Sequence, residues 1–477
     1  MTIMSWASEE MKTINLGDKR LNERLLFLFD KLGNSPNLSI PASCGGWYET
    51  KAAYRFFDHE RVTTESILAP HIESTLSRMN QHSVVLLLQD TTTLNFTGQK
   101  DREDIGPINH EKHLGILLHP ILAVTPERLC LGVLDTYHWA RKKVRHRTAR
   151  EKSRDNHKIP LEEKESYRWL KAYRKANEVA LQVPDTMVVT VADREADIYD
   201  LYHEAQHAYL SKESTTAYWL VRSSSNRKIL NSNGRPDNEK LIEKTKSTSP
   251  LCTITFEIPS KEKQLGRLVT QNLYATELTL CPPDRKRKIS TKYGDKTVAV
   301  TVVIATEINP PEGQEPLEWV LLTNVKIDDA TGAHNILKWY LCRWQIEVYF
   351  RILKSGCRIE KLQLAEKHRF DPCLVLYMII AWRILYLTVL SRECPEVSCE
   401  LIFSTEEWKI AHIILKKEPP PKEPPSLKVM IKMIASMGGY LNRKSDPEPG
   451  PTTLWIGLQR LRDFLLAKQA ISNITYG

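Results

Sequence analysis

Cysteine is scarce in this chain and is not arranged for metal binding or cross-linking. The 477 residues include 9 cysteines, and no two of them form a Cys-x-x-Cys pair. This spacing disfavours a structural zinc site and a disulfide framework, and it fits a reducing cytoplasm. The N-terminal segment MTIMSWASEEMKTINLGDKR lacks an apolar core, so we expect no secretory signal there.

Long apolar runs are also rare. The segment from Leu374 to Leu390 raises the question of a membrane span, but it is shorter than the roughly 20 residues that a span needs. It also carries Arg383 in its middle, and a charge at that depth in a bilayer is costly. We therefore expect a buried core helix and no membrane association.

The composition is that of a soluble globular protein. The hydrophobic fraction is 42%, the charged fraction is 26%, and the formal net charge is +9. At roughly 100–200 residues per domain, the length allows two to four domains. A basic chain suits a polyanionic partner, although many basic proteins bind no nucleic acid, so the charge alone is weak support.

Changes in periodicity divide the chain into regions. Between about residues 16 and 58, leucines recur at helical spacing with arginines among them, which predicts a small helical N-terminal domain. Apolar runs near 84–88, 115–124 and 129–140 predict strands that could form an antiparallel meander. The later predicted segments are a basic loop at 141–158, a helix at 165–182, a β-rich region at about 217–325, a helix from Asp329 to about Lys354, a helix at 371–392, a proline-rich break at 416–426 and a C-terminal helix.

Two aspartates stand at equivalent places, each directly after a predicted buried strand. Asp90 follows VVLLLQ, and Asp193 follows MVVTVA. The carboxyl ends of strands in an α/β sheet converge on one crevice, where two carboxylates would repel each other unless a cation lay between them. Mg²⁺ suits this role because it prefers oxygen ligands, and two ions about 4 Å apart can promote in-line displacement at phosphorus.

The predicted helix before Lys354 offers a third carboxylate. Within WYLCRWQIEVYFRILKSG, a stride of three or four residues places Tyr340, Arg343, Glu347, Arg351 and Lys354 on one face. One acid among several bases suits a surface that faces phosphate. Glu347 can bind a metal there while the arginines and the lysine engage phosphate oxygens.

Ordinary structural roles compete with this interpretation. An aspartate after a strand usually caps a turn or a helix, and Glu347 with Arg351 fits an ion pair across one helical turn. The segment ADREAD also fits a simple helix start. The catalytic interpretation depends on the order strand-Asp, strand-Asp, helix-Glu within one basic chain, and the residues alone leave both interpretations open.

At these residues the chain resembles the DDE transposases of insertion-sequence family four, in the branch typified by the Tn5 transposase. The signature Tyr-x2-Arg-x3-Glu-x6-Lys is complete at Tyr340, Arg343, Glu347 and Lys354. QDTTTLNF and ADREADIYDLY resemble the blocks around the two aspartates, and EINPPEGQEPLEWVLLTN resembles the stretch before the signature. LGDKRLNERL and AYRFF resemble the N-terminal domain, and MGGYLNRKSDPEPGPTTLWIGLQRL resembles the C-terminal one, so the similarity covers nearly the whole chain.

The resemblance implies an α/β fold with a ribonuclease H-like catalytic core and helical domains at both ends. The implied domains are an N-terminal DNA-end-binding domain at 1–70, a catalytic domain at 71–393 with a β-rich insertion at about 225–325, and a C-terminal dimerisation domain at 394–477.

The resemblance also implies a reaction. We expect a bacterial, cytoplasmic and nucleoid-associated enzyme that nicks transposon ends, forms and opens hairpins, and transfers strands into target DNA. Asp90, Asp193 and Glu347 are the expected catalytic residues and would hold two Mg²⁺ ions, with Mn²⁺ as a substitute. The expected partners are double-stranded DNA, as transposon ends and target, and a second copy of the chain in a synaptic homodimer.

Further DNA contacts are implied by the same resemblance. The signature Tyr340, Arg343 and Lys354 would hold phosphates near the metal. Trp319 matches a tryptophan that stacks on a flipped base, and a core role for it is an equal alternative. Arg222 matches a DNA-contacting arginine beside the hairpin. The matched N-terminal positions are Arg20, Arg24, Tyr54 and Arg55, although helix packing is a strong alternative for Tyr54 and for the nearby Phe56.

The chain departs from the family at several places. The basic loop is longer and more positive than its counterpart, Leu21 and Asp58 replace family bases, and Pro419 to Pro425 interrupts the C-terminal region. We therefore expect a different end sequence. Two other functions stay open: an Mg²⁺-dependent nuclease without strand transfer, and a non-catalytic DNA-binding regulator. A glycosidase with paired carboxylates is disfavoured because it does not explain Arg343 and Lys354 beside Glu347.

Overall fold

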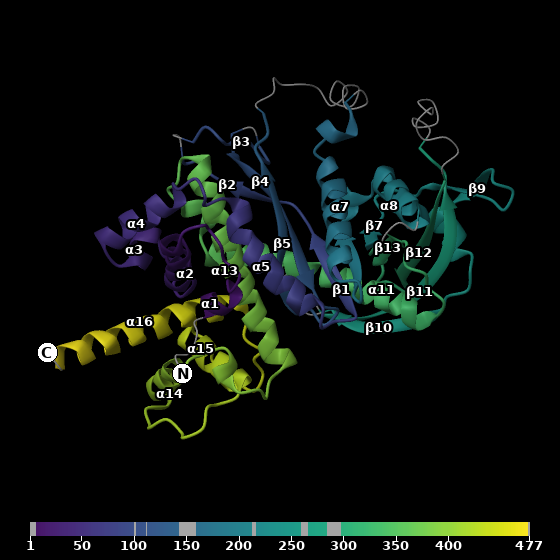
Figure 1. Ribbon diagram of the computed structural model, residues 1–477. Coiled ribbons are helices and arrows are strands. Elements are labelled where there is room, and N and C mark those ends of the chain that lie inside the picture. The colour runs from purple at the N-terminus through teal and green to yellow at the C-terminus, as the bar shows by residue number, and fades with distance from the viewer. Residues whose placement is uncertain are drawn as a thin grey trace. The chain divides into compact units, whose positions relative to one another are not determined.

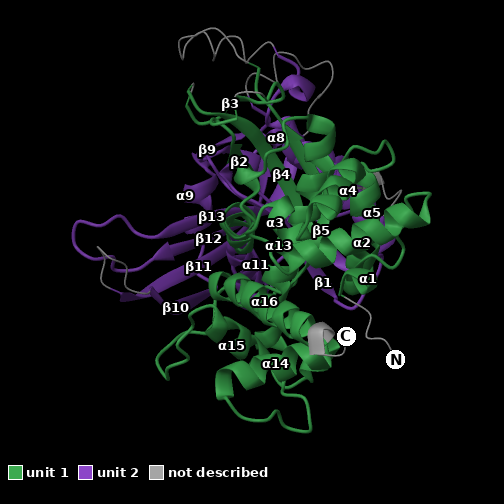
Figure 2. Ribbon diagram, turned by 90° about the vertical axis from the view of Figure 1, so that its left-hand side faces the viewer, with its two compact units in different colours: residues 1–79, 91–145, 345–477 green, residues 80–90, 146–344 purple. Residues whose placement is uncertain are grey.

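The computed structural model describes residues 6–99, 102–110, 112–142, 159–211, 216–258, 266–283 and 297–475. Most of the predicted basic loop, residues 143–158, lies outside this part of the chain. Contacts divide the chain into two compact units (Figure 2). Unit 1 comprises residues 1–79, 91–145 and 345–477, and unit 2 comprises residues 80–90 and 146–344.

Unit 1 begins with the predicted helical domain. Asp18 caps the helix that follows by accepting a hydrogen bond from the Arg20 amide at 2.8 Å. Leu25, Leu28 and Leu32 recur at helical spacing and are buried, which explains why this amphipathic segment folds as a helix. The N-terminal helices are α1 (Trp6–Glu10), α2 (Lys19–Gly33), α3 (Ile40–Cys44), α4 (Trp47–Phe57) and α5 (Thr64–Met79).

Unit 1 continues with an antiparallel group of strands. They are β2 (Thr92–Asn95), β3 (Gly106–Pro107), β4 (Leu114–Val124) and β5 (Cys130–Trp139). β4 pairs with each of the other three, and its residues are almost all buried, which accounts for its continuous apolar sequence. The predicted antiparallel pairing of the strands at 115–124 and 129–140 is confirmed.

The longest apolar segment forms α13 (Lys367–Glu393). It is the one helix among the described residues that is long and apolar enough to cross a membrane, and 89% of its most apolar window is buried inside the protein. The helix packs against α2, α4, α5, α15, α16 and β5, so its whole circumference is covered (Figure 1). This packing agrees with the predicted core helix.

The C-terminal part of unit 1 is helical. It contains η5 (Cys399–Leu401), α14 (Thr405–Lys416), α15 (Leu427–Met437) and α16 (Pro451–Thr475). Ser404 and Glu407 form a reciprocal capping box at the start of α14. The predicted proline-rich break separates α14 from α15, because consecutive prolines remove the amide donors that a helix requires.

Unit 2 is built on a mixed sheet. Its strands are β1 (Val84–Gln89), β6 (Met187–Ala192), β7 (Tyr218–Arg222), β8 (Lys228–Leu230), β9 (Pro236–Lys240), β10 (Cys252–Ile258), β11 (Arg267–Leu280), β12 (Val298–Glu307) and β13 (Glu318–Thr323). They lie in the order β1-β6-β7-β13-β12-β11-β8-β9, with β10 paired to β11. β1, β6 and β7 are parallel, and the β11–β12–β13–β7 pairings are antiparallel.

The helices of unit 2 connect these strands. They are η1 (Leu161–Glu163), α7 (Tyr167–Gln182), η2 (Arg194–Ala196), α8 (Tyr199–Ser211), α9 (Leu241–Lys246) and α11 (Ala330–Cys342). The coarse prediction of a mixed α/β fold with helical segments at both ends of the chain is confirmed. Within the predicted β-rich region, α9 is a helix that we did not predict.

Candidate functional site

The two predicted catalytic aspartates follow adjacent parallel strands. β1 and β6 pair from Val84 with Met187 to Leu88 with Val191, a constant offset of 103 residues (187 − 84 and 191 − 88). The same offset leads from Asp90 to Asp193 (193 − 90 = 103). Neighbouring strands lie about 4.8 Å apart. Asp90 and Asp193 therefore follow two adjacent strands at the same level along the strand direction.

Asp193 also has the structural role that we raised as an alternative. Its Oδ1 accepts a hydrogen bond from the Glu195 amide at 2.9 Å and caps η2. This bond uses one carboxylate oxygen and fixes the side chain at the end of β6. A capping role and a metal-binding role are therefore compatible at this residue, because a carboxylate has several lone pairs.

Arg343 reaches Asp90 within unit 2. Its Nη1 donates to Asp90 Oδ2 at 2.8 Å, and the two side chains are only 10% and 20% exposed. The sequence predicted that Arg343 engages phosphate, but in this structure it neutralises the first aspartate. A guanidinium that pairs with a carboxylate can also pair with a phosphate, since both present two acceptor oxygens.

The segment that carries Glu347 is helical but divided, whereas we predicted one uninterrupted helix. α11 begins at its N-cap Asp329, as predicted, and ends at Cys342. α12 (Trp344–Arg351) carries Glu347 in its first turn, and a π-helical segment (Ile352–Gly356) follows. The regular α-helical spacing that we predicted for the whole segment is therefore interrupted beside Arg343 and again after Arg351.

The π-helical segment packs against a residue that is distant in the sequence, and it carries Lys354. Cys357 donates its amide to the Ile352 carbonyl at 2.8 Å, and a Cβ on Gly356 would lie 2.9 Å from the Trp455 ring. Short π segments are common at functional sites. Burial lowers the pKa of the Lys354 ammonium, and the nearby Glu360 opposes this shift. Arg351, the last residue of α12, is exposed.

Arg222 and Trp319 belong to the same edge of the unit 2 sheet as the aspartates. Arg222 is the last residue of β7, which runs parallel to β6, so it lies at the carboxyl end beside Asp193. β13 is antiparallel to β7 and places Trp319 near its start, at that same edge. Trp319 stacks on Phe256 with ring centroids 6.4 Å apart, which is the packing contact that we considered as its alternative role.

Tyr340 is largely buried. Only 4% of it is exposed, so its position in α11 is that of a packing residue in this structure. The sequence assigned it to DNA phosphates through the signature. That assignment stays a prediction.

Asp197 holds the loops that follow β6 and β7 together. Its buried carboxylate accepts hydrogen bonds from the Tyr202 hydroxyl at 2.7 Å and from the Ser224 amide at 2.7 Å. Arg227 pairs with the same carboxylate and also donates to the Asp197 carbonyl at 2.8 Å. Each of these groups lies in unit 2. The network fixes the segment that begins at Asp193, and we did not predict it from the sequence.

The predicted N-terminal DNA contacts differ in their availability. Arg20 is exposed and pairs only with its neighbour Asp18 among the described residues, whereas Arg24 is held by Glu49 and lies over Phe27. Arg55 is exposed. Tyr54 is half-buried, and this burial raises the pKa of its hydroxyl. The packing alternative for Phe56 is confirmed by its 2% exposure.

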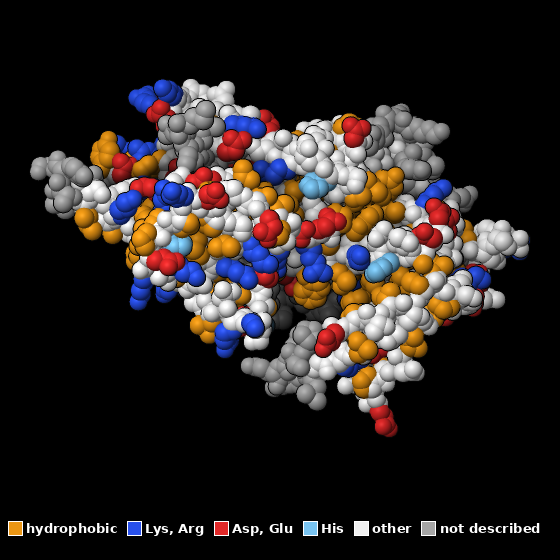
Figure 3. Space-filling model, turned by 90° about the horizontal axis from the view of Figure 1, so that it is seen from below, with side chains coloured by type: hydrophobic (Ala, Val, Ile, Leu, Met, Phe, Trp, Pro, Cys, Tyr) orange, Lys and Arg blue, Asp and Glu red, His pale blue; other side chains and the backbone are white. Residues whose placement is uncertain are grey.

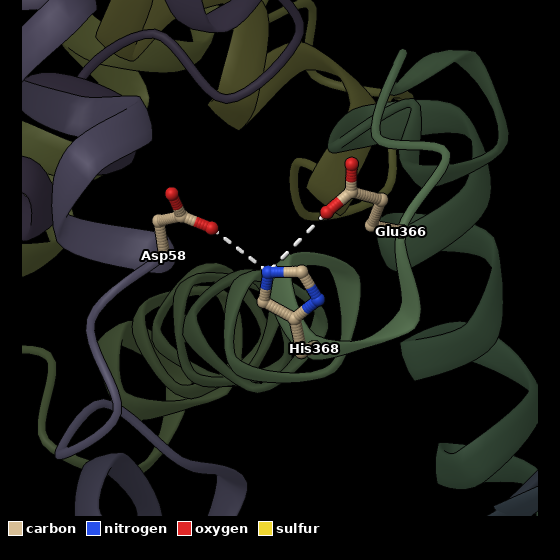
Figure 4. Close-up of side chains that lie close together, drawn as sticks. All are labelled: Asp58, Glu366 and His368. Atoms are coloured by element: carbon tan, nitrogen blue, oxygen red, sulfur yellow. Dashed lines mark hydrogen bonds and ion pairs between the residues drawn. The ribbon is translucent and has the colours of Figure 1, made fainter.

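A second cluster of polar side chains links α4 to the start of α13. Figure 4 shows the His368 imidazole between the carboxylates of Asp58 and Glu366, at 2.8 Å and 3.4 Å. The three ligand atoms lie within 4.8 Å of one another, a spacing that a metal ion could use. Arg369 also donates to Asp58 at 2.9 Å, so the arrangement is that of an exposed ion-pair network.

The molecular surface gives little guidance by charge alone. On the face drawn in Figure 3, basic, acidic and apolar side chains are interspersed. The net charge of +9 is therefore not gathered into one field on that face.

The structure draws attention to Trp47 and Tyr48, which the sequence interpretation passed over. They are 80% and 78% exposed at the start of α4. The signal was present in the sequence, because both residues fall outside the apolar stripe formed by Ala53, Phe56 and Phe57.

Comparison with family models gives two matches near the two ends of the chain. Residues 3–62 match a transposase DNA-binding model, and residues 379–474 match the Tn5 transposase dimerisation domain. These matches support DNA binding and homodimer formation, and they imply an enzyme that cuts and transfers DNA. A transposase DNA-binding segment and a Tn5 dimerisation segment in one polypeptide together support a Tn5-like transposase.

Proposed function

We propose that the chain is a DDE-type transposase that cuts and joins DNA with two Mg²⁺ ions held by Asp90, Asp193 and Glu347. The observation that carries the proposal is the matched position of Asp90 and Asp193 on paired parallel strands. An ordinary cap would need no such match. Two neighbouring carboxylates without a cation would raise each other's free energy in the ionised form.

The chemistry of the side chains fits magnesium. All three proposed ligands are carboxylates, the oxygen donors that Mg²⁺ prefers, and Mn²⁺ accepts the same donors. When bound, the two ions activate an attacking oxygen and stabilise the leaving oxygen of an in-line displacement at phosphorus. Arg343 contacts Asp90, and the family signature places Glu347 four residues after it, which supports Glu347 as the third ligand.

The basic residues would position the DNA. We propose that Arg343 exchanges Asp90 for a phosphate when DNA arrives, and that Lys354 binds a neighbouring phosphate. Arg222 and Trp319 belong to the same sheet edge as Asp193, which supports contacts with a distorted DNA strand there. Stacking of Trp319 on an extruded base would require it to give up Phe256, or to present its other ring face.

We further propose that the chain has the domain arrangement and the reaction steps of the family that it resembles. These are a ribonuclease H-like core within 71–393 with the β-rich insertion at about 225–325, and a synaptic homodimer formed through 394–477. The reaction would run through end nicking, hairpin formation, hairpin opening and strand transfer in the bacterial cytoplasm. The parallel β1–β6–β7 group and its change to antiparallel strands at β13 support a core with an inserted β region.

The test is cleavage of DNA that carries the inverted repeats flanking the gene. The parent protein, with Mg²⁺ or Mn²⁺, should give nicks, hairpins and joined products, and EDTA should abolish all three. Asp90→Asn, Asp193→Asn and Glu347→Gln should each lower the rate by on the order of 1,000-fold, because each removes several kcal/mol of transition-state stabilisation. The matched control is Asp185→Asn, an exposed aspartate just before the opposite end of β6.

Each outcome has a distinct meaning. Nicks without joined products would favour an Mg²⁺-dependent nuclease. Normal DNA binding without any broken phosphodiester bond would favour a non-catalytic regulator. Cleavage by Asp90→Asn at the parental rate would overturn the metal-binding proposal.

A further inference from the structure

A cavity of about 640 Å³ lies in unit 2, the unit drawn in purple in Figure 2, at the sheet edge opposite to Asp193. Met187 and Tyr218 line this cavity and are the first residues of β6 and β7, and Asn324 lines it just after the end of the antiparallel β13. The six residues of β6, at about 3.3 Å each, put roughly 20 Å between Met187 and Asp193. The cavity is therefore separate from the proposed metal site.

Aromatic packing and side-chain hydrogen bonds hold the walls of the cavity in place. Tyr202 of α8 stacks on Trp219 of β7, with ring centroids 4.3 Å apart and an interplanar angle of 22°. Gln206 joins α8 to β12, because its side chain accepts from the Ala299 amide at 2.7 Å and donates to the Thr297 carbonyl at 2.9 Å. The protein alone thus forms the cavity, as is usual for small-molecule sites.

Three polar side chains of the cavity have bonding capacity that the protein does not use. Thr301 is only 4% exposed, yet its hydroxyl has no hydrogen-bond partner among the described residues. Glu277 lies directly opposite Thr301 in the β11–β12 pairing, and Lys326 follows β13. Both charged residues are exposed, and neither forms an ion pair within the described part of the chain. A nearly buried hydroxyl without a partner costs free energy, so Thr301 marks a place for a polar atom of a ligand.

We propose that this cavity binds a small aromatic zwitterion, a molecule with an aromatic ring, an ammonium group and a carboxylate, as in aromatic amino acids and their dipeptides. In this assignment the ring packs against Tyr218 and the apolar wall. The ammonium pairs with Glu277, the carboxylate pairs with Lys326, and the Thr301 hydroxyl bonds to one of these two ligand groups. The inference goes beyond the proposed function, because none of these residues belongs to the proposed metal site.

The two charges at the cavity favour a zwitterion over ligands of one sign. A nucleotide would bring several negative charges close to Glu277, and an organic cation would lie close to Lys326, so each would suffer repulsion. Ala299 is exposed like both charged residues, so the cavity opens to solvent where the charges lie. Sites of about 300–1,000 Å³ enclose small organic ligands, so the volume admits a single amino acid or a dipeptide.

Tyr202 connects the cavity to the segment that begins at Asp193. Its ring forms part of the cavity wall, while its hydroxyl donates to the Asp197 carboxylate at 2.7 Å. A bound ligand stabilises the conformation to which it binds, so an occupied cavity should reduce local opening of residues 193–202. The site thereby has a route to influence the segment that carries Asp193.

The experiment titrates the full-length protein with four probes by isothermal titration calorimetry near pH 7. L-phenylalanine and L-phenylalanyl-glycine carry both charges, phenethylamine carries only the ammonium, and 3-phenylpropionate carries only the carboxylate. The variants E277Q, K326Q and T301V each remove one polar group, and A299W places a bulky ring in the cavity. Circular dichroism melting checks that each variant is folded.

The parent should bind the zwitterionic probes with a Kd of about 1 mM or lower, and hydrogen exchange in residues 193–202 should slow when they are present. The tighter of the two zwitterionic probes identifies whether an amino acid or a dipeptide is preferred. A299W should lower the affinity by about 10-fold or more. T301V should keep the parental Tm, because the hydroxyl has no protein partner, and should weaken binding by about 3-fold.

Each charge variant should affect only the probes that carry the complementary group. E277Q should weaken binding of L-phenylalanine by about 3-fold to 10-fold and leave that of 3-phenylpropionate within about 2-fold of the parent. K326Q should weaken binding of 3-phenylpropionate to a similar extent and leave that of phenethylamine unchanged. E257Q and K240Q are matched controls that should bind all probes like the parent, because each removes an exposed charge of unit 2 outside the cavity.

Several results would contradict the inference. Absence of binding of every probe to the parent up to about 10 mM would overturn it outright. Parental affinity in a folded A299W variant would show that the probes bind elsewhere. Equal affinity for all four probes, unchanged in E277Q and K326Q, would refute the assignment to a zwitterion, and binding without slower hydrogen exchange would refute the connection through Tyr202. None of these results concerns DNA cleavage, so the proposed function is tested separately.

Discussion

The guanidinium of Arg343 donates to the carboxylate of Asp90 at 2.8 Å, although 253 residues separate them in the chain. The pair is largely buried, and it lies at the sheet edge to which Asp193 also belongs. A positive group beside Asp90 offsets the repulsion that the neighbouring aspartate would cause. Arg343 can therefore offset the charge of Asp90 when no metal ion is bound, and this effect can be measured as a change in stability.

Replacing Arg343 by glutamine should expose that role. Without Mg²⁺ the free energy of unfolding should fall by about 3 kcal/mol, because a largely buried carboxylate loses its ion pair with Arg343. Addition of Mg²⁺ should then raise the Tm more in Arg343→Gln than in the parent. Differential scanning fluorimetry across a magnesium titration gives both quantities. Equal responses of the two proteins would show that Asp90 needs no compensating cation.

Asp197→Asn should destabilise the segment after β6. The amide cannot balance the charge of Arg227 and cannot accept all the bonds that the carboxylate accepts, so we expect a loss of about 3 kcal/mol in urea unfolding. Asp185→Asn, an exposed site near the other end of the same strand, should stay within about 0.5 kcal/mol of the parent. Similar values for both variants would mean that the network contributes little.

Trp319 allows packing and DNA stacking to be separated. Trp319→Ala should slow hairpin formation by about 10-fold or more and leave the first nick unchanged, since a stacked base is worth about 1–3 kcal/mol. Trp319→Phe should keep most of both activities. Denaturing gels resolve nicked, hairpin and joined DNA. A variant that loses stability but forms hairpins at the parental rate would assign Trp319 to packing against Phe256 alone.

Asp58 should make stability depend on acid pH. Hydrogen bonds from Arg369 and then His368 lower the pKa of Asp58 from 3.8 to about 2. Because the folded-state pKa lies below the unfolded value, the stabilisation is present above pH 3.8 and is lost as the pH falls through about 2. The Tm of the parent should exceed that of Asp58→Asn by about 1–2 °C at pH 5, and the difference should shrink toward pH 2. A difference that stays constant with pH would contradict this assignment.

The local elements of the site were predictable from the sequence. Continuous apolar runs before Asp90 and Asp193 predicted two buried strands, and Asp329 marked the start of α11. The pairing of β1 with β6 was not predictable from periodicity, because it joins segments 103 residues apart. The sequence could therefore place each aspartate at a strand end, and the structure adds that the two ends are at the same level.

Other features depend on tertiary contacts that a periodic pattern does not encode. The π-helical segment after Arg351 goes with the close packing of Gly356 on Trp455, about a hundred residues later. The partners of Asp197 come from residues 5 to 30 positions away. Trp47 and Tyr48 have side chains that are typical of a core, so only their position outside the apolar stripe of α4 indicates in the sequence that they are exposed.

The shared offset of β1 and β6 acts as a constraint on how this gene can change. Strand residues alternate between the two faces of a sheet, so the loss or gain of a single residue in one strand would turn its terminal aspartate to the opposite side. A matching gain or loss of one residue in the other strand would be required to return both aspartates to the same side of the sheet. Insertions can accumulate in the connecting loops of such a protein, whereas the lengths of β1 and β6 can change only together.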